Sequence, residues 1–159
     1  MKKNRYKIIV FTIAVVFLIV LGREFATPYR ISGDCMEPAI TDGKLYFLNK
    51  MSPYLHSYQI DDIIVFKHEG KDWISRIVAL ENNTIQITEG SVIVNGAPLE
   101  DKGIHRNWSG WKRGAYAIDQ PLQVPVDHVF VLSDNLSAEH DDSRVFGPIA
   151  NSAILGLIW

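Results

Sequence analysis

The chain has 159 residues, a formal net charge of −2 and a single cysteine. This length provides one compact domain and a short additional segment. The small negative charge argues against a general nucleic-acid-binding protein. One cysteine excludes both an internal disulfide and a zinc site built from several cysteines.

The amino-terminal segment is first basic and then strongly apolar. Residues 1–7 carry four basic side chains, and residues 8–22 form an apolar run. These fifteen residues would rise about 22 Å as a helix, and flanking residues can extend the span toward a ~30 Å hydrocarbon core. The pattern predicts a transmembrane anchor at residues 8–25, with a cleavable signal peptide as the alternative. The positive-inside rule then places residues 1–7 in the cytoplasm and residues 26–159 on the extracytoplasmic face of the cytoplasmic membrane.

The sequence after the apolar run predicts a mainly β domain. Short runs rich in β-branched and aromatic residues are separated by turn formers such as Gly, Asn and Asp, which is typical of strands joined by tight turns. We predict strands at residues 44–49, 63–67, 73–80, 84–88, 91–94 and 128–132. Residues 84–96 are expected to form a hairpin that turns at Gly90. Residues 103–120 have little periodicity and are predicted to form a loop, on which Trp108 and Trp111 either contact lipid or pack against the domain.

Three further segments combine polar residues with turn formers in a fixed order. Residues 33–40 are Gly-Asp-Cys-Met-Glu-Pro-Ala-Ile, and residues 75–80 are Ser-Arg-Ile-Val-Ala-Leu. Ser-Asp-Asn at residues 133–135 is followed at residues 142–149 by Asp-Ser-Arg-Val-Phe-Gly-Pro-Ile.

These segments resemble, in order and spacing, the conserved boxes of type I signal peptidases. The family boxes are Gly-Asp-Ser-Met-x-Pro-Thr-Leu, then Lys-Arg-Val-Ile-Gly-Leu, then Gly-Asp-Asn followed by Asp-Ser-Arg-x-Phe-Gly-Pro-Val. Residues 61–66, Asp-Asp-Ile-Ile-Val-Phe, are similar to a further strand of the family. The resemblance covers the whole chain and suits the compact, single-span members. It implies a signal-peptidase-type β domain with one amino-terminal transmembrane helix, and a Ser–Lys dyad that cuts signal peptides from exported preproteins.

The chain departs from this family at both positions of the dyad. Cys35 holds the position of the nucleophile, and Ser75 holds the position of the general-base lysine. A hydroxyl has no useful basicity near neutral pH, so Ser75 cannot replace a lysine whose pKa is lowered by desolvation. Lys67 and Lys71 lie near Ser75 in the sequence but match no motif, and we expect them to be solvated. The Ser–Lys mechanism is therefore absent.

The turn around Cys35 is expected, by the same resemblance, to bind substrate. Its candidate substrate-binding residues are Gly33, Asp34, Met36 and Pro38. We expect Gly33 and Asp34 to form a turn that leaves backbone amides free, and such amides stabilise an oxyanion. Met36 packs beneath the cleft in the family, although the sequence equally allows it to be part of the core.

His140 offers a different base for the thiol. A nearby imidazole lowers the pKa of a cysteine, which also needs less activation than a serine. In many relatives the position of His140 is a serine that hydrogen-bonds the dyad lysine, so the resemblance places His140 beside Ser75. One hypothesis is therefore a Cys35–His140 pair, oriented by Asp141 or Asp142.

The alternative is that His140 is only a polar loop residue. In that case Asp142 and Arg144 form an ion pair and, with Ser143, a structural motif that holds the loop. The histidines at positions 56, 68, 105 and 128 show no spacing typical of a metal site, so we expect no metal and no cofactor.

Two classes of function follow. In the first, a membrane-anchored signal-peptidase-like protein handles exported preproteins with impaired or absent peptidase activity, or serves as a chaperone in the assembly of surface proteins or pili. In the second, the protein is an active signal peptidase with a Cys35 nucleophile and a base such as His140. Signal peptides or preproteins and membrane lipid are the expected partners in both classes, and nucleic acid is not.

Overall fold

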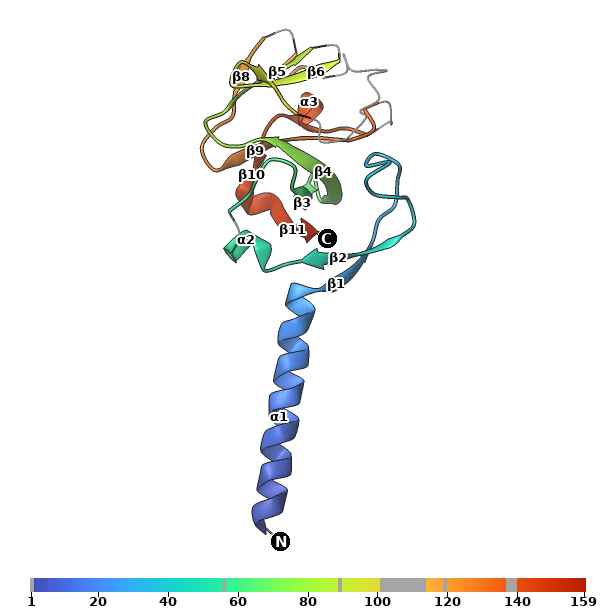
Figure 1. The fold of residues 1–159 in the computed structure, drawn as a ribbon, viewed down its shortest axis with the longest axis vertical. Coiled ribbons are helices and arrows are strands. Elements are labelled where there is room, and N and C mark those ends of the chain that lie inside the picture. The colour runs from blue at the N-terminus through green and yellow to red at the C-terminus, as the bar shows by residue number, and fades with distance from the viewer. Residues whose placement is uncertain (1, 56, 89, 101–113, 119, 137–139) are drawn as a thin grey trace.

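A long helix leads into a β-rich body (Figure 1). The computed structural model describes residues 2–55, 57–88, 90–100, 114–118, 120–136 and 140–159. The expectations for His56, His105, Trp108 and Trp111, and for most of the predicted loop at residues 103–120, lie outside these residues.

Helix α1, Lys2–Phe25, covers the predicted apolar run. Its apolar side chains are exposed, as at Phe11 (70%) and Leu18 (65%). Within the part of the chain that the structure describes, none of the helices combines the length and the apolar character that a membrane crossing requires. The structure therefore confirms a helix here, but it does not confirm the transmembrane anchor predicted at residues 8–25.

The larger sheet is antiparallel and contains the turn that carries Cys35. Within the described residues its strand order is β1-β2-β11-β3-β4-β9-β10. The strands are β1 Thr27–Arg30, β2 Leu45–Asn49, β3 Ile63–His68, β4 Lys71–Ala79, β9 His128–Leu132, β10 Ile149–Ala150 and β11 Ile154–Ile158. Strands β4 and β9 pair Arg76 with Leu132. This register brings two of the motif segments, residues 75–80 and 133–135, side by side.

A smaller sheet packs against one end of the larger one (Figure 1). Its order among the described strands is β7-β6-β5-β8. The strands are β5 Thr84–Thr88, β6 Ser91–Val94, β7 Ala97–Pro98 and β8 Leu122–Gln123. Thr88 lies opposite Ser91, so the predicted hairpin is confirmed. Ile85 and Ile87 of β5 pack with Phe130 of β9 in one buried cluster, which joins the two sheets.

The six predicted strands are all confirmed, with ends that agree to within one or two residues. The short strands β1, β7, β8 and β10, and the longer β11, were not among the predictions. Three single-turn helices complete the described elements: α2 Ser52–Leu55, α3 Ser143–Phe146 and a 3₁₀ turn at Asn151–Ala153.

The turn between β1 and β2 is fixed to the core. Cys35, Met36 and Ile40 are buried in one cluster with Val65 of β3 and Ile74 of β4. Met36 is completely buried, at 0% exposed. Burial of these side chains removes apolar surface from water and holds the turn on the β3–β4 hairpin.

Candidate functional site

Cys35 is buried, and its surroundings disfavour a thiolate. The residue is 5% exposed, and its Sγ lies 4.0 Å from the carbonyl oxygen of Ile74, to which it donates a weak hydrogen bond. Burial raises the pKa of the thiol to about 11, and the negative charges of Asp34 and, to a smaller extent, Asp134 and Asp142 act in the same direction. The thiol is therefore protonated at neutral pH.

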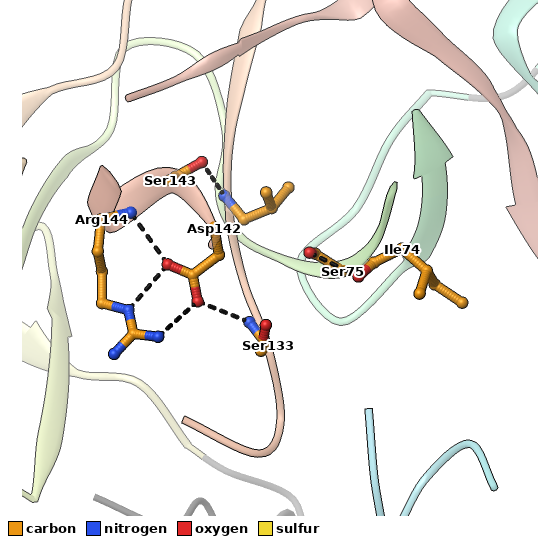
Figure 2. Close-up of polar contacts among 7 residues, drawn as sticks. Ile74, Ser75, Ser133, Asp142, Ser143 and Arg144 are labelled. Atoms are coloured by element: carbon orange, nitrogen blue, oxygen red, sulfur yellow. Dashed lines mark hydrogen bonds and ion pairs between the residues drawn. The ribbon is translucent and has the colours of Figure 1, made fainter. Parts of the chain in front are cut away.

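Ser75 lies on β4 and uses the same acceptor. Its Oγ donates to the carbonyl oxygen of Ile74 at 2.7 Å (Figure 2). Ser75 is 1% exposed, so this bond satisfies a hydroxyl that water does not reach. The two dyad positions, Cys35 and Ser75, thus surround one carbonyl group, and both direct a proton toward it. Neither is placed to remove a proton from the other.

The turn residues before Cys35 differ from expectation. The backbone N–H of Gly33 donates to Asp42 Oδ1 at 2.8 Å, so the expectation that this amide is free is wrong. The reason is that Asp42, nine residues later, returns to close the turn. Gly33 has a φ of +112°, and a Cβ there would lie 3.2 Å from His140 Nε2. The turn therefore requires glycine both for its backbone conformation and for the approach of His140.

His140 reaches the Cys35 turn from the segment between β9 and α3. Its Nε2 lies 3.9 Å from Asp34 Oδ1. A small cavity of about 70 Å³ separates the two segments, and its lining includes Cys35, Ser133, His140 and Asp141. Cys35 and His140 therefore line one cavity, and His140 has a carboxylate neighbour in Asp34.

Asp142 is committed to the loop itself. Its Oδ1 accepts from Arg144 N (3.0 Å) and Nε (2.8 Å), and its Oδ2 accepts from Arg144 Nη2 (2.9 Å) and from Ser133 N (3.1 Å) (Figure 2). The two side chains are 0% and 2% exposed, so this is a buried, bidentate ion pair. Ser143 Oγ accepts from Val131 N at 3.0 Å and joins the same loop to β9. Both carboxylate oxygens of Asp142 accept hydrogen bonds from Arg144 and Ser133 N, so Asp142 stabilises the loop and does not orient the His140 imidazole.

A second buried ion pair was missed by the sequence interpretation. Arg76 Nε and Nη2 donate to Asp134 Oδ1 and Oδ2 at 2.9 and 2.7 Å. The next residue, Asn135, donates its backbone N–H to Cys35 O at 2.8 Å. The sequence did hold a signal for this pair. Arg76 directly follows Ser75, and Asp134 directly follows Ser133, so two motif segments carry opposite charges at matching places. We call Arg76, Asp134, Asp142 and Arg144 the ion-pair network.

The nearby lysines and histidines lie outside this arrangement. Lys67 Nζ is 3.7 Å from Asp72 Oδ1, and both side chains face solvent. The ring of His68 packs on Phe146, with centroids 4.4 Å apart. His128 Nδ1 hydrogen-bonds to Val126 O at 2.8 Å.

The chain matches the family model described as "Signal peptidase, peptidase S26" over residues 4–158. It is similar to Signal peptidase I of Bacillus amyloliquefaciens, with 26% identity over 91% of this chain and 80% of that protein. It is also similar to Signal peptidase IB of Staphylococcus aureus, with 27% identity over 99% of this chain and 89% of that protein. A crystal structure of a signal peptidase I from Enterococcus faecalis shares its fold, with a TM-score of 0.50 and 24% identity over 64% of this chain and 96% of that one. Because the family match spans nearly the whole sequence, the chain belongs to the signal peptidase, peptidase S26, family.

Proposed function

We propose that this chain binds the signal-peptide region of exported preproteins and does not cleave it by Ser–Lys chemistry. The class of ligand is supported by the relatives, which are signal peptidases. The observation that carries the proposal is the shared acceptor, since Cys35 Sγ and Ser75 Oγ both donate to Ile74 O. A nucleophile and its base must exchange a proton, and two donors directed at a third group do not.

The electrostatics of the turn support the same proposal. A pKa of about 11 leaves about one thiol in ten thousand ionised at pH 7. Attack on a peptide carbonyl would also need N–H donors for the resulting oxyanion. The N–H of Gly33 is already bonded to Asp42. Both the nucleophile position and one candidate oxyanion donor are therefore committed to other contacts.

The test measures binding and cleavage in the same sample. The full-length chain, solubilised in detergent, is incubated with a labelled preprotein and with the matching mature protein that lacks the signal peptide. We expect saturable binding of the preprotein only, without cleavage, both for the unmodified chain and for Cys35→Ala. Cleavage that disappears in Cys35→Ala would overturn the proposal in favour of a cysteine peptidase.

A second candidate function is peptidase activity through a Cys35–His140 pair. It is favoured by one observation, namely that both residues line the same small cavity. A protonated imidazole in that cavity would stabilise the thiolate. Alkylation of Cys35 would then be fast near neutral pH and slow in His140→Ala. Equal alkylation profiles for the two proteins would exclude the pair.

We also propose that α1 holds the body at the cytoplasmic membrane, with residues 26–159 on the extracytoplasmic face. The support is the exposure of its apolar side chains, such as Val16 and Phe17, and the basic residues that precede them. The full chain should remain in the membrane pellet after alkaline extraction. A variant carrying Val16→Asp and Phe17→Asp should be released. Release of the unmodified chain would refute this part of the proposal.

A further inference from the structure

A second, much larger cavity lies at the end of the body that α1 joins. Its walls come from β1, β2, α2 and β11, which Figure 1 shows beside the end of α1. Its volume is about 590 Å³, compared with about 70 Å³ for the cavity beside Cys35, and we call the two the large cavity and the small cavity. A cavity of several hundred Å³ encloses a ligand with several side chains, whereas the small cavity holds one small side chain.

The two cavities are neighbours, because Asp72 of β4 lines both of them. Strand β1 begins just after α1 and passes the large cavity first, at Thr27 and Tyr29, before the chain reaches the small cavity at Ser32. Tyr29 Oη donates a long hydrogen bond of 3.4 Å to Asp72 Oδ2. A ligand that fills the small cavity and continues toward α1 therefore enters the large cavity past Asp72.

The lining of the large cavity is mostly apolar. Leu48 and Ile154, which are buried, and Met51 and Leu155, which are half-buried, contribute to its walls. Removal of apolar surface from water is the main source of affinity in a cavity of this kind. The large cavity therefore favours bulky apolar side chains, while the small cavity accepts only a small one.

Tyr54 of α2 extends this lining into solvent. Its side chain is 81% exposed, although it lines the large cavity. The helix that carries it is fixed to the sheet, because Ser52 Oγ donates to Asn49 O at 2.7 Å and accepts from Leu157 N of β11 at 3.0 Å. A tyrosine on a fixed turn offers a large contact area and loses little conformational entropy when a ligand packs against it.

We propose that the large cavity binds the carboxyl-terminal end of the apolar segment of a signal peptide, and that the small cavity binds the small residues that follow it. This inference rests on the proposed function, because it names the part of the signal peptide that each cavity takes. A signal peptide has an apolar segment followed by a small-residue site, and the two cavities have the matching sizes and order, counted from α1. An apolar segment that leaves the membrane beside α1 meets the large cavity first.

A lipid acyl chain is the competing occupant of an apolar cavity at this place. The peptide is favoured because the large cavity adjoins the small one at Asp72, so that one extended chain fills both. The charged residues in the described lining, Lys50 and Asp72, are also of opposite sign. They therefore provide no net attraction for the phosphate of a lipid.

The test uses labelled peptides that share one Ala-x-Ala site and carry a single leucine in an otherwise polar segment before it. The leucine is moved one position at a time, and the peptide without it is the reference. Binding to the detergent-solubilised full-length chain is measured by fluorescence anisotropy. At one position, or at two neighbouring ones, leucine should strengthen binding about tenfold, as burial of one large apolar side chain provides after the cost of ordering it.

Two variants test whether the large cavity causes this preference. Ser152→Trp places a bulky ring in the lining and should abolish the leucine effect, and Tyr54→Ser should reduce it. Leu55→Ser is the matched control, because Leu55 is 70% exposed on the same helix but is not part of the lining that the structure describes. It should keep the full leucine effect. All three positions are exposed, so each variant should unfold close to the temperature of the unmodified chain. If Ser152→Trp does not fold, Tyr54→Ser against Leu55→Ser decides.

The outcomes separate this inference from the proposed function. Binding of the reference peptide without a leucine effect at any position overturns the inference alone. A leucine effect that persists in full in both Ser152→Trp and Tyr54→Ser also overturns it. Phospholipid that remains on the unmodified chain in native mass spectrometry and is lost from Ser152→Trp, in place of a leucine effect, would assign the large cavity to lipid and overturn the inference. If the unmodified chain binds none of the peptides, both the proposed function and this inference fail.

Discussion

The ion-pair network and the two dyad positions are neighbours of opposite character. In the network, each guanidinium donates two hydrogen bonds to its aspartate, and all four side chains are buried. At the dyad positions, Cys35 and Ser75 are neutral and share one carbonyl acceptor. None of the network's hydrogen bonds involves the Cys35 or Ser75 side chain, so the network holds the motif segments in place without a nucleophile–base pair beside it.

The largest effect is expected when a charge is returned to the dyad. Cys35→Ser with Ser75→Lys supplies a nucleophile and a base, and we expect preprotein cleavage to rise about 10²- to 10⁴-fold, the usual contribution of a general base. Adding Ser133→Gly should raise it further, because the antiparallel register of β4 and β9, continued one residue beyond the Arg76–Leu132 pair, sets Ser133 opposite position 75. Cleavage rates are measured by electrophoresis against Cys35→Ser alone. No gain in either combination would mean that the network does not hold the segments in a productive arrangement.

The next largest effect concerns the network itself. Asp142→Ala leaves the Arg144 guanidinium buried without its carboxylate, and removal of one partner of a buried ion pair costs about 3–5 kcal/mol. Urea unfolding measures this loss. Lys67→Ala, which removes an exposed ion pair with Asp72, is the control and should cost less than about 1 kcal/mol. Equal losses in the two variants would contradict the structural role of the network.

The pH dependence of stability reports the desolvation of the Cys35 thiol. Its pKa in the folded chain, about 11, lies above the ordinary value of 9.0, so the folded state keeps its proton longer than the unfolded state. The resulting stabilisation is complete below about pH 9 and is lost as the pH rises toward 11. It amounts to about 2–3 kcal/mol. The unmodified chain should therefore lose more stability than Cys35→Ala between pH 8 and 11. Parallel curves would show that the thiol is not desolvated.

The smallest effect is expected at the turn glycine. Gly33→Ala places a Cβ at a φ of +112° and close to His140, and we expect a loss of about 1–2 kcal/mol. Gly70→Ala has a similar positive φ, +78°, but open space around its Cβ. Thermal unfolding of both variants separates the backbone strain from the contact with the imidazole. The loss should be larger for Gly33→Ala.

The fold was predictable where strands carry regular patterns. Strand β5 alternates buried residues with exposed or half-buried ones, and its predicted bounds are those observed. Strands β7, β8 and β10 have two residues each, too few to show a period. Strand β11 contains Gly156, where a Cβ would meet Asn49 O at 2.5 Å. Such a glycine permits close packing of two backbones but weakens the sequence signal of a strand.

For the site, the motifs predicted which residues belong to it but not the contacts that these residues make. They locate Cys35 and Ser75, but the acceptor that these residues share depends on how the β1–β2 turn packs against β4. The partners Arg76 and Asp134 are 58 residues apart, and the bond that occupies Gly33 comes from Asp42. The high pKa of the thiol arises first from its burial, which exists only in the folded chain, and only then from the charge of the adjacent Asp34.

Strand β11 is the strand that completes the larger sheet. It follows every other described strand in the chain, yet it lies between β2 and β3 in the larger sheet. During synthesis, the β1–β2 ribbon therefore cannot be hydrogen-bonded to β3 through β11 until residues 154–158 have been made. The segment that carries Cys35 lies within that ribbon. Within the larger sheet, this ribbon is joined to β3 through β11, while the Cys35 turn itself packs on Val65 and Ile74.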